Sequence, residues 1–188
     1  MSNTHSKQGA SSLQVRKLTY AALFLALALV LPFLTGQIPE IGSRLCPMHI
    51  PVLLCGFLCG WPWGLAVGFI APLLRSLLFG MQPLFPAAVA MAFELAVYGG
   101  VAGWLYLKLP RKNISLYIAL LIAMIAGRVV WGVVRLILAG LSGKTFTWAM
   151  FIAGAFVDAL PGIILQIALI PLLVIALERA GLSLNKGK

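Results

Sequence analysis

Long apolar stretches separated by short polar intervals make up nearly the whole chain. Residues 44–100 are almost entirely apolar, although proline and glycine interrupt them repeatedly. A helix rises 1.5 Å per residue, so about 20 apolar residues cross a bilayer. On this measure we expect helices at 18–35, 87–107, 114–140 and 148–177, and two more within 50–79, divided at the GWPWG sequence of residues 60–64. The pattern predicts an all-α integral membrane protein with six transmembrane helices.

The distribution of basic residues predicts the orientation of these helices. In the loops 36–49, 80–86 and 141–147, the only Lys or Arg residues are Arg44 and Lys144. Nine of the fourteen basic residues lie instead at the chain ends or in the turn 108–113: Lys7, Arg16, Lys17, Lys108, Arg111, Lys112, Arg179, Lys186 and Lys188. Because cytoplasmic loops are enriched in Lys and Arg, both termini are expected in the cytoplasm. We therefore expect a flexible cytoplasmic tail (1–16), a membrane domain (17–178) and a basic cytoplasmic tail (179–188).

Composition excludes several classes of function. Hydrophobic residues make up 62% of the chain and charged residues 10%, unlike a soluble domain. The net charge of +10 does not indicate nucleic acid, since no basic surface interleaved with aromatic residues is evident. HExxH, GxSxG and Walker A motifs are absent from the sequence, so we expect neither an enzyme nor an ATPase. Any energy for transport would come from a partner or an ion gradient.

Cys46, Cys55 and Cys59 form no CxxC pair. They are expected to be small packing residues rather than metal ligands or redox groups, and no metal or cofactor is predicted.

Small residues at four-residue spacing predict close helix contacts. One series is Gly60, Gly64 and Gly68, and another is Ala88, Ala92, Ala96 and Gly100. In lipid, such faces allow backbones to approach closely.

Five ionisable residues fall inside expected helices, all at the membrane midplane or on its outer side: Arg75, Glu94, Arg128, Arg135 and Asp158. A charge in the membrane costs a few kcal/mol unless it is paired or hydrated. One interpretation is internal pairing, of Arg128 with Asp158 and Arg135 with Glu94. However, three cations face two anions. A polar cavity that opens outward and binds an anionic or strongly polar small molecule explains this excess better.

The helical faces agree with such a site. Arg128, Trp131 and Arg135 share one face of the fifth helix, and Asp158 and Gln166 share a face of the sixth. Glu94 lies one turn from Tyr98. His49 stands at a loop edge, where a surface or capping role competes with a ligand contact.

With these features the chain resembles the S-component, the substrate-binding membrane subunit, of energy-coupling factor (ECF) vitamin transporters. The resemblance covers about residues 17–178 and rests on the size, the six helices, the long first outer loop and Ala22-x-x-x-Ala26. It also rests on PMHIPVLLCGFLCGWPWGLAVGFIAPLLRSLL, GMQPLFP and AVAMAFELAVYG, with the last two closest to pantothenate-type and related branches.

The resemblance implies a mechanism and a set of roles. The substrate would bind in an outward pocket formed by helices 4 to 6 and covered by the loops after helices 1 and 3. Ala22 and Ala26 would dock on a transmembrane coupling subunit attached to two ATPases, and the S-component would topple in the membrane. The expected substrate-binding residues are Arg75, Glu94, Tyr98, Arg128, Trp131, Arg135, Asp158 and Gln166, and the expected gating residues are His49, Met81, Gln82 and Phe85.

The substrate is less closely defined. Excess positive charge favours a carboxylate such as pantothenate, whereas Tyr98, Trp131 and Trp148 would also suit a pyridoxine or a pterin ring. Two other classes of function remain: a stand-alone secondary carrier for a small polar or anionic solute, and a structural membrane subunit. The expected location is the cytoplasmic membrane of a bacterium or archaeon.

Overall fold

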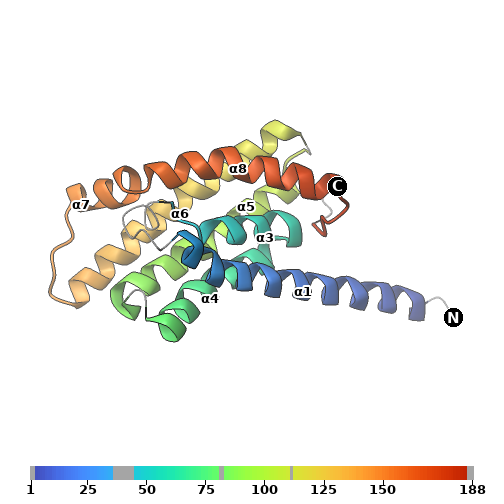
Figure 1. Cartoon of the computed structure of the whole chain (residues 1–188), viewed down its shortest axis with the longest axis horizontal. Coiled ribbons are helices and arrows are strands. Elements are labelled where there is room, and N and C mark those ends of the chain that lie inside the picture. Colours follow the sequence, from blue (N-terminus) through green and yellow to red (C-terminus); the bar gives the residue numbers. More distant parts are fainter. Residues whose placement is uncertain (1–2, 36–44, 81–82, 111, 186–188) are drawn as a thin grey trace.

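The computed structural model describes residues 3–35, 45–80, 83–110 and 112–185, and this part of the chain is helical with no strand. The helices are α1 (Asn3–Thr35), α3 (His49–Cys59), α4 (Trp61–Phe79), α5 (Val89–Lys108), α6 (Asn113–Leu141), α7 (Trp148–Ile152) and α8 (Leu160–Arg179). Two π-helical turns, η1 (Leu84–Ala88) and η2 (Ala153–Val157), precede α5 and α8. Figure 1 shows one elongated bundle, with the two ends of the chain toward one end of it and the α6–α7 connection at the other.

Five segments of the described chain are long and apolar enough to cross a membrane. They are Ser12–Leu34, Trp61–Phe79, Leu84–Lys108, Asn113–Leu141 and Trp148–Arg179. The expected second crossing is α3, which has only 11 residues and a length of about 16 Å. This is about half of the ~30 Å hydrocarbon thickness. The chain is thus an all-α multi-pass membrane protein, and the sixth crossing and the orientation stay predictions.

The first helix begins earlier than predicted. Residues 3–16, expected as a tail, continue α1 toward the N-terminus. The sequence estimate used the onset of apolar residues, but Gln, Lys and Ser are also compatible with a helix. Apolarity therefore predicted the span and not the helix start.

Glycines bring α3, α4 and α5 into close contact. A Cβ placed at Gly64 would lie 2.6 Å from the Gly56 Cα, and one at Gly103 would lie 2.5 Å from the Gly56 oxygen. A Cβ at Gly68 would meet the Leu95 carbonyl. Two members of the predicted glycine series are therefore helix contacts. The third, Gly60, has a φ of 102° and separates α3 from α4.

One end of the bundle is fastened by polar contacts. The Leu184 N–H donates to the Leu58 carbonyl (2.8 Å), and Asn185 Nδ2 donates to the Phe57 carbonyl (3.0 Å). These bonds satisfy carbonyls at the end of α3 that lack helical partners. Nearby, the Tyr106 hydroxyl donates to Glu178 Oε2 (3.0 Å), joining α5 to α8. Gly60, Lys108 and Arg179 lie at this end, which we call the inner end because it would face the cytoplasm in the orientation expected from the sequence.

Candidate functional site

A buried ion pair lies at the centre of the candidate site. Arg128 on α6 places its Nη1 3.0 Å from Oε1 of Glu94 on α5, and both side chains are buried. His49, at the start of α3, places its Nε2 3.6 Å from the same Glu94 oxygen. We name Glu94, Arg128, His49, Tyr98 and Gln166 the central cluster. Three helices supply charged or polar groups to the ion pair itself.

Local packing explains why the ion pair forms at this position. Gly127 precedes Arg128, and a Cβ there would lie 2.5 Å from the ring of Tyr98. The ring of Tyr98, fully buried, also contacts the His49 ring edge-to-face at 5.2 Å between centroids. The glycine thus lets α5 and α6 approach until Glu94 and Arg128 meet.

Gln166 supplies a buried amide from α8. Its side chain is 1% exposed, and neither its Nε2 nor its Oε1 has a hydrogen-bond partner among the described residues. The Tyr106–Glu178 hydrogen bond fixes the level of α8 against α5. Glu94 lies twelve residues before Tyr106 and Gln166 twelve before Glu178, about 18 Å along each helix. By this count Gln166 and Glu94 lie at about the same depth.

The short α3 places His49 at this depth as well. Phe57 contacts Tyr106 edge-to-face at the inner end, and His49 lies eight residues before Phe57, as Tyr98 does before Tyr106. The His49–Tyr98 contact agrees with this register. His49 is 2% exposed, so the structure does not support a surface role for it. Both of its ring nitrogens lack a hydrogen-bond partner among the described residues.

Cys46 is a neighbour of the site that sequence reasoning missed. Its sulfur lies 4.0 Å from Arg128 Nη2, and burial raises the pKa of its thiol. Cys46 has a φ of 48°, which is uncommon for a residue other than glycine. Such backbone often occurs at functional positions. A cysteine next to a proline in a loop gave no periodic signal that could have placed it there.

Trp131 and Arg135 form a separate aromatic group on α6. The Arg135 guanidinium carbon lies 5.7 Å from the Trp131 ring centroid and 5.8 Å from that of Phe146. Asp158 lies at the end of η2 and is exposed. The internal pairing considered from the sequence was therefore wrong in its partners, since Glu94 pairs with Arg128.

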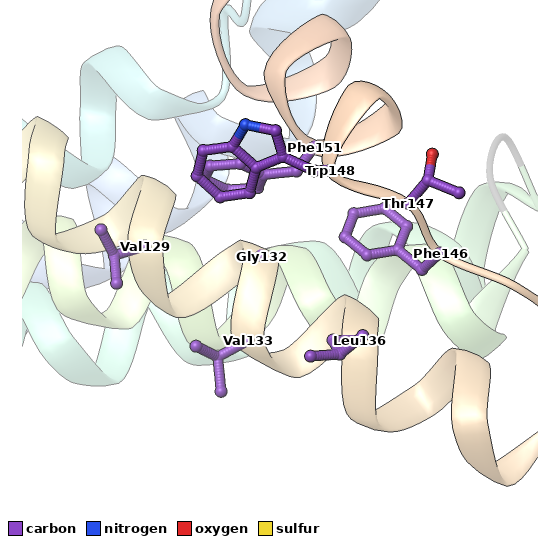
Figure 2. A pocket seen from close by; sticks show the side chains of 8 residues that line it. All are labelled: Val129, Gly132, Val133, Leu136, Phe146, Thr147, Trp148 and Phe151. Carbon is purple, nitrogen blue, oxygen red and sulfur yellow. The ribbon is translucent and has the colours of Figure 1, made fainter.

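A largely apolar cavity of about 390 Å³ adjoins this aromatic group (Figure 2). In Figure 2, Trp148 and Phe151 lie on one side of α6, and Phe146, from the connection before α7, lies farther along the same side. The residues that line the cavity are Val129, Gly132, Val133, Leu136, Phe146, Thr147, Trp148 and Phe151. It could hold an apolar or aromatic part of a ligand.

The remaining predicted residues lie elsewhere. Arg75 is buried against α1, where its Nη1 donates to the Leu29 carbonyl (3.5 Å) and its guanidinium carbon lies 5.4 Å from the Phe33 centroid. Phe85 is half-exposed in η1. Met81 and Gln82 lie outside the described residues.

Ala22 and Ala26 are exposed on α1. Ala21, Phe24 and Ala28 of the same helix are buried. The predicted docking residues thus lie on the face of α1 that the bundle leaves uncovered.

The chain was compared with known proteins. The model of the family described as "ECF transporter, substrate-specific component" matches residues 16–174. The comparison with curated proteins gives no match. The family match covers every described residue of the central cluster and both alanines of α1.

Proposed function

The chain belongs to the substrate-specific components of ECF transporters, and from this premise we propose that its central cluster binds an anionic, water-soluble micronutrient. The family supplies the substrate-binding subunit of a transporter, which works with a membrane-embedded module of coupling and ATPase subunits. The chain is therefore a transport subunit. The family membership favours this role over a stand-alone carrier and over a purely structural subunit.

The observation that supports this site most strongly is the set of buried polar atoms without hydrogen-bond partners at the ion pair and, at a similar depth on α8, at Gln166. Both amide atoms of Gln166, both ring nitrogens of His49 and the Nε of Arg128 lack hydrogen-bond partners among the described residues. A buried polar group left unpaired costs about 1–3 kcal/mol. A ligand with several donors and acceptors would remove this cost, which supports the proposal that the cluster binds one.

Within this class we propose pantothenate as the first candidate. Its carboxylate would accept a hydrogen bond from Arg128, and charge-assisted bonds of this kind are strong. Its hydroxyl and amide groups would complement His49 and Gln166. Because Glu94 already neutralises much of the charge on Arg128, the substrate also needs neutral polar groups and not charge alone.

An aromatic vitamin is the competing substrate class. A pyridoxine or pterin ring would use the apolar cavity between α6 and α7 instead, where Phe146, Trp148 and Phe151 lie. Aromatic rings at 4.5–7 Å add about 0.5–1.5 kcal/mol to binding.

Ligand release and thermal stability test the proposal together. Mass spectrometry of the small molecules released when the purified chain is denatured would identify a retained ligand. A thermal-shift screen would follow, since a ligand that binds the folded state raises the melting temperature. We expect pantothenate in both measurements. A single aromatic vitamin would overturn the substrate assignment, and an empty protein that no vitamin stabilises would overturn the binding proposal.

We further propose that α1 docks on the coupling subunit through Ala22 and Ala26. Both are exposed and small, as a close helix contact in lipid requires. The location proposed for the assembly is the cytoplasmic membrane of a bacterium or archaeon.

A further inference from the structure

Two hollows meet at Trp61 near the inner end of the bundle. The first is a cavity of about 470 Å³ with a partly polar lining, which includes Gln14, Lys17, Trp63 and Asn185. The second is a groove of about 470 Å³ along α4 and α5, lined by Leu65, Phe69, Phe93, Ala96, Gly100 and Trp104. Trp61 lines both. A polar hollow and an apolar one therefore adjoin at a single side chain.

The groove has the dimensions and chemistry of a site for a hydrocarbon chain. Its long walls come from large side chains that are exposed, among them Phe69, Phe93 and Trp104. The small residues Ala96 and Gly100 are also part of its lining. From Trp61 to Phe69 it extends eight residues, about 12 Å along α4. One leaflet of the hydrocarbon core is about 15 Å thick, so the groove follows most of one leaflet.

Cations lie where each hollow meets the inner end. Lys17 lines the polar cavity, and the Lys108 Nζ lies 5.6 Å from the centroid of Trp104, which lines the groove. Arg16, Lys112 and Arg179, at the same end, are exposed. Basic side chains at a membrane surface attract anionic lipid headgroups, at about 1 kcal/mol for each Lys or Arg.

We propose that these two hollows form a binding site for one anionic phospholipid. The phosphate-bearing headgroup lies at the polar cavity beside Lys17, and one acyl chain follows the groove between α4 and α5. The ring of Trp61 stands at the boundary between headgroup and chain, where tryptophan is enriched in membrane proteins. This site is separate from the central cluster, which is built from α3, α5, α6 and α8 deeper in the bundle.

Native mass spectrometry tests the proposal with the full-length chain in detergent. The protein is titrated with phosphatidylglycerol and with phosphatidylcholine of the same acyl chains. We expect tighter binding of phosphatidylglycerol, and about a fivefold loss of that affinity in Lys17→Gln. Lys144→Gln is the matched control, because Lys144 is exposed in the α6–α7 connection at the opposite end of the bundle. Equal binding of the two lipids, or an equal loss in the control, would overturn the proposal.

A second variant tests the groove. A Cβ at Gly100 meets only the side chain of Leu65, at 3.5 Å, so Gly100→Leu fills the groove without a backbone clash. We expect this variant to lose phosphatidylglycerol binding while it keeps its helix content and its melting temperature in lipid-free detergent. If it instead keeps its lipid but no longer assembles with the coupling subunit, the groove is a protein interface and the lipid proposal is wrong.

Discussion

Replacement of Arg128 separates the structural role of the ion pair from its role in binding. Arg128→Met removes the guanidinium that pairs with Glu94, which is 1% exposed, and leaves only the His49 ring, with its Nε2 at 3.6 Å, beside the same carboxylate oxygen. Breaking a buried pair from one side costs about 3–5 kcal/mol, because the remaining charge stays buried without compensation. Glu94→Gln together with Arg128→Met removes both charges and keeps similar side-chain volumes. Such neutral replacements of a buried pair are often no less stable than the pair itself.

We therefore expect a large fall in melting temperature for Arg128→Met and recovery in the double variant. Substrate binding should fall at least tenfold in both, since the carboxylate of the substrate loses its cation. Unfolding in detergent and calorimetric titration with the identified substrate measure the two effects. Arg135→Met is the matched control. Its guanidinium lies over aromatic rings, where a contact is worth up to about 2 kcal/mol. A double variant that binds substrate like the original chain would refute the assignment of the site.

Three further variants and one control variant test the rest of the structure. Gln166→Leu should lower substrate affinity at least tenfold without loss of melting temperature, because it removes a buried amide that has no partner in the described chain; a stability loss equal to the affinity loss would contradict this. Gly64→Val should prevent normal folding, since a Cβ there would lie 2.6 Å from the Gly56 Cα. Gly140→Val is the control, because a Cβ there meets open space, and it should change the free energy of unfolding by no more than about 1 kcal/mol. Ala22→Trp should keep substrate binding but block transport in reconstituted vesicles that contain the coupling and ATPase subunits, and loss of both would show a structural role for this face of α1.

Helix positions were predictable because bilayer crossing demands apolar length. The sequence GWPWG was correctly interpreted as the division between two helices, since glycine and proline interrupt helical structure. The start of α1 was not predictable in this way. A polar helical segment carries no hydropathy signal, and residues 3–11 of α1, which precede the candidate span Ser12–Leu34, are of this kind.

The charged members of the site were predictable, but their partners were not. Glu94 and Arg128 stand out because charge inside apolar segments is costly. Which carboxylate Arg128 meets depends on the axial register of α5 against α6, which is fixed by the packing of Tyr98 on Gly127. Arg75 satisfies the same sequence criterion and yet faces α1. Sequence spacing describes one helix at a time and contains no information on such contacts.

The hydrogen bonds at the inner end have a consequence for transport by this chain without its partner subunits. At the inner end, Leu184 and Asn185 hydrogen-bond to carbonyls of α3, and the Tyr106–Glu178 hydrogen bond joins α5 to α8. We expect these bonds to oppose the passage of a solute through that end, so a bound molecule would leave the site from the side by which it arrived. A subunit whose binding site opens on one side only would bind its substrate without carrying it across the membrane. Vesicles that contain this chain alone should retain at most one substrate molecule per subunit, however steep the gradient.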